Sequence, residues 1–213
     1  MKTEETEKQS KEQLILQAAE QEFLSKGYDG ARTISIAAAA GVTHAMLHYY
    51  FRTKEQLFER ILEEKMTLMA SSMLAVLGDP ELPLQERLAQ GISRHFDFVM
   101  ANPDLPRFII NEVITHPDRL AIMQQHVARI AGSMFVRLQQ DIDAAALRGE
   151  IEQIDVRMLM LDIVSLNIAP FLVYPVVQPS FGDVAADRER FWLLRKSETI
   201  ETINRRIRKN NTI

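Results

Sequence analysis

The segment from Thr33 to Leu57, TISIAAAAGVTHAMLHYYFRTKEQL, constrains the fold more than any other part of the chain. It begins with small apolar residues, Ile36 to Ala40, that would let a short helix pack closely against its neighbours. Gly41 can adopt the left-handed conformation that ends such a helix, and Thr43 is a favourable N-cap for a second one. The segment therefore predicts a helix-turn-helix, a unit that presents its second helix to the major groove of DNA.

A third helix should begin directly after this unit. Thr53 and Gln56 have the spacing of a capping box. The apolar positions that follow recur at helical spacing as far as Leu77, without an intervening proline or glycine. A single helix is therefore expected to connect the N-terminal part of the chain with the rest, up to the turn at Gly78-Asp79-Pro80.

The remaining sequence is helical in pattern and shows no strand alternation. A helix that starts at Asp155 is apolar on nearly all sides, which favours burial in its own fold or against a partner, and Pro170 should kink or end it. The sequence thus predicts an all-α protein with a flexible tail, a three-helix helix-turn-helix domain and a helical C-terminal domain. Their expected limits are residues 1–9, 10–52 and 53–213. Helices outside the central motif are expected from Ser10 to Gly27 and over residues 84–99, 105–115, 118–148 and 183–208.

Composition narrows the function classes. The chain has no cysteine, so it has no disulfide, thiol nucleophile or thiolate metal site, which fits a reducing cytoplasm. No apolar run reaches the roughly 20 residues of a membrane span, and the N-terminal residues lack the apolar core of a secretion signal. We find no glycine-rich phosphate loop, Glu-x-x-His pair or nucleophile motif, and expect no catalytic residue, metal or cofactor.

Charge is more informative locally than over the whole chain. The net charge of −4 argues against a nonspecific coat on nucleic acid. Residues 26–60, in contrast, carry five basic and three acidic side chains, with two histidines that can add positive charge. A weakly positive module on an acidic body suits a DNA-binding protein that relies on oriented contacts and dimerisation. Charge scattered over a solvated surface explains the same numbers equally well.

Residues 14–62 resemble the TetR family of one-component transcriptional regulators. The resemblance covers about a quarter of the chain, and its specificity lies in the combination of motifs. The residues that carry it are Ala18-Ala19, Phe23, Gly27-Tyr28, Thr33, Ile36-Ala37, Ala39-Ala40-Gly41-Val42-Thr43, Leu47, Tyr49-Tyr50-Phe51 and Lys54-Glu55-Gln56-Leu57. One departure is His48, where the family most often has tyrosine.

The resemblance implies how such a protein would work. It implies a homodimer through the last two helices, a C-terminal domain that binds a small organic effector and mediates dimerisation, and a palindromic double-stranded operator. Effector binding in such proteins moves the DNA-binding heads out of register with the operator. Most members repress transcription, and some activate it.

The second helix of the motif should supply the base contacts. His44, Ala45 and His48 share its exposed side, because positions i, i+1 and i+4 lie on one face of a helix. The spacing of His44 and His48 also permits a two-histidine metal face, although no carboxylate or third ligand lies nearby in the sequence.

Phosphate contacts are predicted from four residues around the same helix. Thr33 and Lys54 lie where helices should begin, and backbone N–H groups there also favour an anion. For Tyr49, packing in the core is the alternative. The predicted phosphate contacts are Thr33, Thr43, Tyr49 and Lys54.

An effector pocket is predicted from polar residues on apolar helices and from aromatic residues that could form its walls. Asn167 is the favoured contact, because it lies in the most apolar helix just before Pro170, and a kink there opens space. Each polar candidate is more often a satisfied core or surface residue than a ligand contact. The predicted set is His95, Phe96, Arg107, Phe108, Asn111, His126, Asn167, Phe171 and Tyr174.

The leading hypothesis is therefore a cytoplasmic DNA-binding transcriptional regulator, a homodimeric repressor released from its operator by a small molecule. Its two recognition helices should lie about 34–36 Å apart, one turn of B-DNA, or a multiple of that distance. The alternative is a helical small-molecule binding protein without operator binding, to which His48 gives some support. An all-helical enzyme is the third hypothesis, and no motif supports it.

Overall fold

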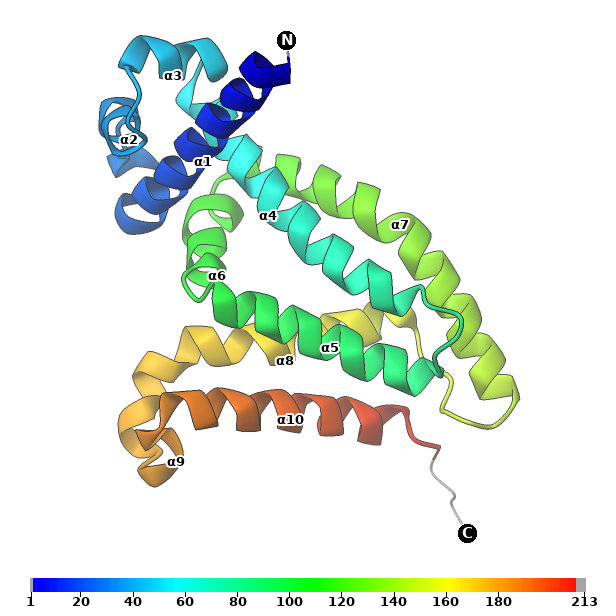
Figure 1. Cartoon of the computed structure of the whole chain (residues 1–213). Coiled ribbons are helices and arrows are strands. Elements are labelled where there is room, and N and C mark those ends of the chain that lie inside the picture. Colours follow the sequence, from blue (N-terminus) through cyan, green and yellow to red (C-terminus); the bar gives the residue numbers. More distant parts are fainter. Residues whose placement is uncertain (1, 210–213) are drawn as a thin grey trace. The chain divides into compact units, whose positions relative to one another are not determined.

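The computed structural model describes residues 2–209, and these residues form helices joined by short turns (Figure 1). The prediction of an all-α fold is confirmed: within this range the only β pairing is an isolated bridge between Ile151 and Arg208. The helices are α1 (Lys2–Gly30), α2 (Thr33–Ala39), α3 (His44–Tyr50), α4 (Lys54–Leu77), α5 (Leu84–Ala101), α6 (Leu105–Phe108), the π-helix η1 (Ile109–Ile114), α7 (Pro117–Leu147), α8 (Val156–Val177), the 3-10 helix η2 (Gln178–Ser180), α9 (Asp183–Ala186) and α10 (Arg188–Ile207).

The chain packs as two compact units. The N-terminal unit comprises the residues up to Thr67 together with Arg107–His126, so η1 and the start of α7 pack with the first helices. The C-terminal unit comprises Leu68–Pro106 and the residues from Val127 onward. These units are defined by how the chain packs. The domain boundaries predicted from the sequence, at residues 10 and 53, stay a prediction.

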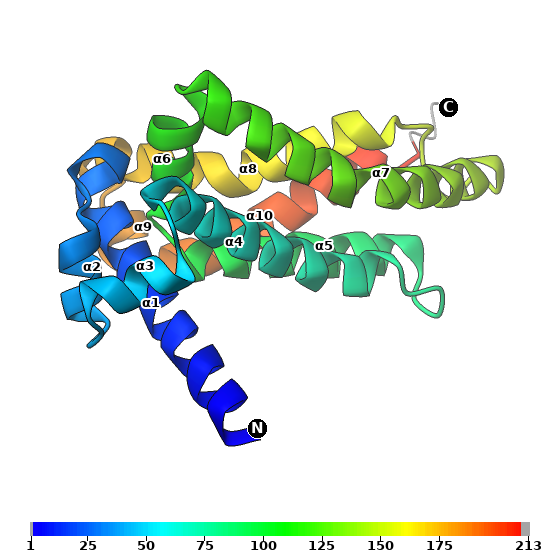
Figure 2. The ribbon, with the colours of Figure 1, turned by 90° about the horizontal axis from the view of Figure 1, so that it is seen from above.

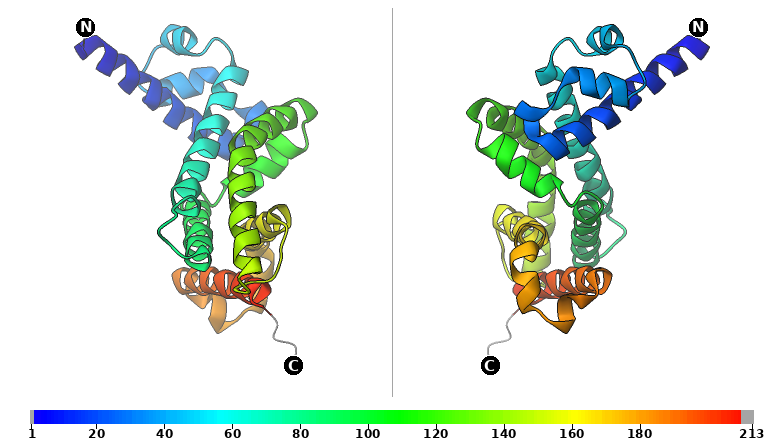
Figure 3. Two further views of the ribbon diagram at one scale, coloured as in Figure 1. Left: turned by 90° about the vertical axis from the view of Figure 1, so that its right-hand side faces the viewer. Right: turned by 90° about the vertical axis from the view of Figure 1, so that its left-hand side faces the viewer.

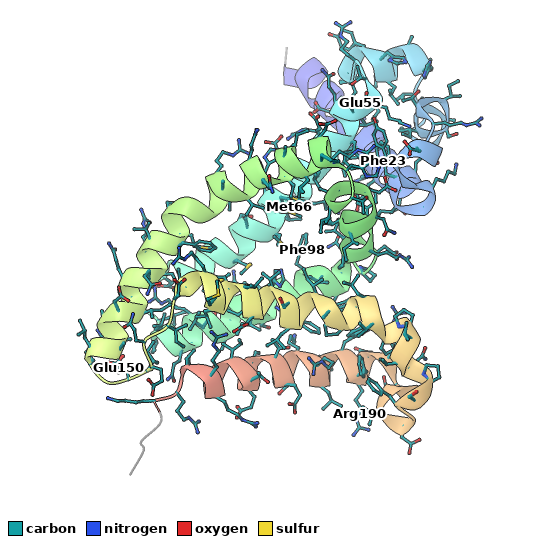
Figure 4. All side chains as sticks on the ribbon, turned by 180° about the vertical axis from the view of Figure 1, so that it is seen from behind. Phe23, Glu55, Met66, Phe98, Glu150 and Arg190 are labelled. Carbon is teal, nitrogen blue, oxygen red and sulfur yellow. The ribbon has the colours of Figure 1, made fainter. Side chains whose placement is uncertain are left out.

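The N-terminal unit is built around an aromatic core, with α1, α2 and α3 lying together in Figure 2. Phe23 meets Phe58 edge to face at 5.4 Å between ring centroids, and Phe108 packs on the other side of Phe58 at 5.5 Å. Phe23 is labelled within this unit in Figure 4. Ile36 and Leu47 bring α2 and α3 onto the core, and both are almost fully buried.

Helix α1 is longer than predicted. The structure continues it through residues 2–9 to Lys2, so the helix does not begin at Ser10. Residues 2–9 are mostly lysine, glutamate and glutamine, which favour helix, and no glycine or proline interrupts them. Gly27 breaks the regular helix as predicted, because its φ of 70° and ψ of 174° are not helical. The segment Tyr28 to Gly30 then continues as a short separate turn of helix.

The C-terminal unit buries a larger apolar core between α5, α7, α8 and α10. Helices α8 and α10 lie side by side (Figure 3), and both contact α5. Fully buried side chains of this core include Leu88, Ile92, Leu138, Ile142, Leu159 and Ile163.

Helix α8 continues through Pro170 to Val177, so of the two expected effects of this proline the end of the helix is excluded. Burial of Ile163 and Tyr174 on either side of Pro170 holds the helix despite the lost hydrogen bond. The helix expected over 183–208 is two helices. Asp187 is extended, with a φ of −101° and a ψ of 103°, and its side chain accepts a 3.0 Å hydrogen bond from the backbone N–H of Arg190, so it caps α10 instead of continuing α9.

The stretch Val156–Ser180, which is α8 with the short turn after it, is long and apolar enough for a membrane span, so the expectation that no apolar run is long enough is wrong. Its contacts with α5 and α10 and its fully buried Asn167 are those of a core helix. Since 28% of this stretch is buried, much of its apolar surface is uncovered in the single chain.

Candidate nucleic-acid interface and effector site

The recognition helix α3 is held by its ends and one buried side chain. Gly41, with a φ of 67°, makes the turn from α2, and the Thr43 hydroxyl accepts a 3.2 Å hydrogen bond from the backbone N–H of Met46. Both predicted roles are confirmed. Leu47 is 1% exposed and anchors the inner face of α3. The helix therefore has a fixed inner face and an outer face free to meet a ligand.

The predicted base-contacting residues lie on that outer face. His44, Ala45 and His48 are all exposed. The rings of the two histidines meet edge to face at 4.4 Å between centroids. The His44 Nε2 atom lies 3.0 Å from the Thr33 hydroxyl, so a side chain of α2 orients a side chain of α3. Thr33 is the first residue of α2 and not its cap, because Arg32 holds the extended N-cap position.

A metal site on these histidines gains no support from the described residues, among which no group of three or more histidine or acidic side chains is placed to hold a metal ion.

Tyr49 is 64% exposed, and its ring meets that of Tyr50 at 5.5 Å. Tyr49 therefore presents an exposed phenol on the recognition helix itself, and core packing does not describe this side chain.

Lys54 has a structural role that its predicted phosphate contact did not include. Its ammonium group donates hydrogen bonds to the backbone carbonyls of Tyr28, at 2.8 Å, and Ala31, at 3.2 Å. It also lies 4.4 Å from the centroid of the Tyr28 ring. Lys54 therefore ties the start of α4 to the end of α1, and a phosphate would have to share or replace these partners.

A polar cluster around Tyr28 was missed by the sequence analysis. The Tyr28 hydroxyl donates to the Glu55 carboxylate, and this bond holds the pKa of Glu55 below its usual value. Burial raises the pKa of Tyr28 above its usual range, so the phenol keeps its proton. The Arg119 guanidinium stacks 3.8 Å from the centroid of the same ring and pairs with Glu112 at 3.1 Å. Tyr28 thus lies between two cations, Lys54 and Arg119.

No sequence signal links the two halves of this cluster. Tyr28 and Glu55 belong to the helix-turn-helix motif, whereas Glu112 and Arg119 lie on the π-helix and α7. The tight approach is visible at Gly27, where a Cβ would lie 2.6 Å from a carboxylate oxygen of Glu112. The cluster joins residues 107–126 to the DNA-binding helices within the N-terminal unit.

The predicted effector residues do not form one group. Arg107, Phe108, Asn111 and His126 belong to the N-terminal unit, and Phe108 packs against Phe58 in its core. The other predicted residues belong to the C-terminal unit: His95, Phe96, Asn167, Phe171 and Tyr174.

In the C-terminal unit, His95 and Asn167 form a buried polar pair. The Asn167 side-chain amide donates to the backbone carbonyl of Ile92 at 3.1 Å and lies 2.9 Å from His95 Nδ1. Burial lowers the pKa of His95 to about 4, so the imidazole is neutral at pH 7. The Asn167 Oδ1 atom has no hydrogen-bond partner among the described residues, which is uncommon for a buried amide.

Next to this pair lies an aromatic cluster. Phe171 stacks on Trp192 at 4.2 Å between ring centroids, and Phe96 lies 5.4 Å from Phe171. Tyr174 and Phe191 complete the cluster. Three of the residues predicted for the effector pocket, Phe96, Phe171 and Tyr174, lie in this cluster, and their role as pocket walls stays a prediction. The two aromatic residues of α10, Phe191 and Trp192, were not predicted.

Comparison with known proteins fits this architecture. Residues 15–61 match the profile of the family described as bacterial regulatory proteins, tetR family. The HTH-type transcriptional repressor NicS of Pseudomonas putida is 28% identical over 138 residues, and the match spans 63% of this chain and 63% of that protein. The fatty acid metabolism regulator protein of Bacillus subtilis is 26% identical over 153 residues, 71% of this chain and 77% of that protein.

Solved structures share the fold over nearly the whole chain. A TetR family transcription regulator from Marinobacter aquaeolei VT8 superposes with a TM-score of 0.64 at 20% identity, covering 94% of this chain and 97% of that one. A bacterial regulatory protein in the tetR family from Rhodococcus RHA1 gives a TM-score of 0.67 at 21% identity, covering 91% and 96%. Residues 15–61 therefore carry the helix-turn-helix module of the tetR family of regulators, and the whole chain shares the fold of solved members of that family.

Proposed function

We propose that the protein is a repressor that binds a palindromic operator as a homodimer in the bacterial cytoplasm and leaves it when a small organic molecule binds the C-terminal unit. The observation that carries the proposal is the geometry of α3. Leu47 fixes the helix from inside, while His44, Ala45 and His48 remain exposed on its outer face. A helix of this shape is suited to lie in a major groove.

The side chains divide into two roles. We assign base contacts to His44, Ala45 and His48, and among these His48 can donate to a purine N7 or O6 atom. We assign phosphate contacts to Thr33, Thr43, Tyr49 and Lys54. Thr33 supports both roles, because its hydroxyl lies within hydrogen-bond distance of the His44 ring.

Dimerisation through α8 and α10 is supported by apolar surface that the single chain leaves uncovered. On α8, Leu161 is 58% exposed and Val176 is 79% exposed, and on α10 Leu193 is 52% exposed. Large apolar side chains exposed on two neighbouring helices are what an interface would cover. A dimer would bring the two α3 helices to successive major grooves of one operator.

The effector residues are proposed within the C-terminal unit, around His95, Asn167 and the neighbouring aromatic cluster. Their support is the unpartnered Asn167 carbonyl and the adjacent aromatic side chains. The names of similar regulators refer to different processes, such as nucleoid occlusion and fatty acid metabolism, so they do not identify the effector of this chain.

Fluorescence anisotropy with palindromic DNA from upstream of the protein's own gene tests the operator assignment. We expect saturable binding that exceeds binding to scrambled DNA by about 10³-fold or more. Tyr49→Ala should weaken binding to both DNAs, whereas Glu189→Gln, an exposed change on α10, should have no effect. Salt-sensitive binding without sequence preference would contradict the proposal and favour the small-molecule binding alternative.

A further inference from the structure

The two histidines of the recognition helix α3 form a pair whose members are held differently. The rings of His44 and His48 meet edge to face at 4.4 Å between centroids. The Nε2 atom of His44 lies 3.0 Å from the Thr33 hydroxyl, so one of its ring nitrogens has a partner on α2. In the described part of the chain, no hydrogen bond or ion pair joins His48 to another residue. Both ring nitrogens of His48 are therefore left for a ligand.

The Thr33 hydroxyl determines where His44 carries a proton. A hydroxyl has one proton to donate, whereas a phosphate oxygen can only accept. When Thr33 donates its proton to an operator phosphate, its oxygen is left to accept from His44, which then carries a proton on Nε2. The His44 ring is held in place by this bond and gives His48 a fixed neighbour.

One further proton is easier to add to this pair than two, because two cationic rings in contact repel each other. The two ends of α3 differ in their preference for that charge. His44 is the first residue of the helix, where free N–H groups disfavour a cation, and His48 lies in its last turn, where free carbonyls favour one. His48 is therefore the better site for the proton.

The protein around the pair is free of acidic side chains in sequence. Residues 30–54 contain no aspartate or glutamate. Helix α2, which packs against α3, has no titratable side chain, and the other titratable groups of α3 are Tyr49 and Tyr50. The remaining charged side chains of this stretch are the cations Arg32, Arg52 and Lys54.

The acidic residues nearest to this stretch are engaged elsewhere or lie apart. Glu22 of α1 pairs with Lys26 at 2.8 Å, and Glu55 of α4 accepts the hydrogen bond of the Tyr28 hydroxyl. Asp29 is exposed at the end of α1, and no contact joins it to either histidine in the described residues. An imidazolium at His48 therefore depends on DNA for its acceptor.

Guanine offers the acceptors that such a cation needs. On its major-groove edge guanine presents only acceptors, N7 and O6, whereas adenine and cytosine each present an amino donor. An imidazolium donates from both nitrogens and accepts nothing. A neutral imidazole can also accept from an amino group, so it distinguishes these bases less.

We propose that operator binding is coupled to the uptake of one proton by His48 of each protomer, whose imidazolium donates to a guanine, and that Thr33 is a positioning residue that acts through His44. The proposal rests on the proposed function, because it concerns the same face of α3. Sequence preference then strengthens as the pH falls through the range in which imidazoles change charge.

Fluorescence anisotropy of the full chain with the operator and with scrambled DNA tests this coupling. The two affinities are measured from about pH 8 to about pH 6 at constant ionic strength, with EDTA present to remove metal ions. Uptake of one proton changes an affinity by up to about tenfold per pH unit, so we expect the operator-to-scrambled ratio to rise at least about tenfold. His48→Gln has no titratable group at this position and should show no rise. A 7-deazaguanine at the contacted position of each half-site lacks the N7 acceptor and should also remove the rise.

The role of Thr33 is tested by two variants and a control. Thr33→Val keeps the shape of the side chain without its hydroxyl, and it should reduce the rise to about threefold or less, whereas Thr33→Ser should restore it. Loss of a phosphate contact alone would weaken both DNAs alike and leave the pH profile unchanged. His116→Gln is the matched control, because His116 Nδ1 lies 3.0 Å from the Thr115 hydroxyl outside the helix-turn-helix. It should keep the profile of the parent.

The proposal is overturned if the ratio of the parent does not change with pH, or if His48→Gln retains the rise. An equal gain for operator and scrambled DNA would place the proton at a phosphate contact and would also overturn it. A parent-like profile for Thr33→Val would contradict the positioning role. If the parent prefers the operator to the same degree at every pH, this proposal alone fails. If it shows no sequence preference at any pH, the proposed function itself fails.

Discussion

The recognition helix and the predicted effector residues differ in how far apart in sequence their partners lie. In α3, the cap from Thr43 to Met46 and the anchor at Leu47 lie within five residues, and the sequence motif specifies them directly. The polar pair in the C-terminal unit joins His95 to Asn167 across 72 residues. Short-range contacts follow from local chemistry, whereas long-range contacts depend on packing that no motif records.

The first prediction tests the anchor of α3. Leu47→Ala removes a side chain that is 1% exposed, and we expect it to lower the free energy of unfolding by about 2–5 kcal/mol. Urea unfolding followed by circular dichroism measures the change. His48→Ala, on the outer face of the same helix, should change stability by no more than about 0.5 kcal/mol. Similar losses for both would show that the two faces of α3 do not differ as described.

The second prediction tests the approach of Glu112 to α1. Gly27→Ala places a side chain in a conformation with positive φ and against the Glu112 carboxylate, and it should cost about 1–3 kcal/mol. Gly132→Ala is the control, because this helical glycine of α7 has open space around it. It should stabilise the protein by about 0.5–1 kcal/mol. A neutral Gly27→Ala would mean that the observed turn is not required.

The third prediction uses the buried pair of the C-terminal unit. The pKa of His95 is lowered from 6.5 to about 4, so between these values the unfolded chain binds a proton that the folded chain does not. Stability should therefore fall as the pH falls through this window, by about 1.6 kcal/mol between pH 6.5 and 5. His95→Gln should remove this part of the slope. The lowered pKa of Glu55 acts only at lower pH, below the usual value of that carboxyl.

The fourth and smallest effect is expected at Tyr28. Tyr28→Phe removes the hydrogen bond to Glu55 and keeps the ring between Lys54 and Arg119, so the cost should be about 0.5–1.5 kcal/mol. The raised pKa of Glu55 in the variant, measured by NMR titration, would identify the lost bond as the cause. An unchanged Glu55 pKa would contradict the contact.

The sequence predicted the elements that depend on neighbouring residues. It predicted the turn at Gly41, the cap at Thr43 and the continuity of α4 to Leu77. The helix start predicted at Ser10 is wrong, because Ser10 lies inside a longer run of helix-forming residues. The helix propensity of those residues outweighed the capping preference of the serine. Asp187 shows the converse, because its extended backbone and its side-chain cap begin a new helix, α10, inside a segment whose apolar pattern predicted one continuous helix.

The tertiary part of the site was beyond sequence reasoning for a physical reason. The stacking of Arg119 on Tyr28 requires α7 to return to the end of α1, and neither residue carries a local pattern that fixes this path. Lys54 could be recognised as a cation at a helix start, but its two carbonyl partners come from the preceding helix. The residues predicted to bind the effector are divided between the two units for the same reason. A polar side chain on an apolar helix does not indicate which other residues will pack beside it.

The central claim is that the exposed face of α3 reads bases, and the salt dependence of operator binding by His48→Ala tests it most directly. We predict that this variant loses preference for the operator over scrambled DNA, by about 1–3 kcal/mol, while the slope of log K against log salt stays the same. Lys54→Gln is the comparison and should weaken both DNAs alike. If His48→Ala instead keeps its sequence preference and weakens binding uniformly, α3 does not read the operator through this face.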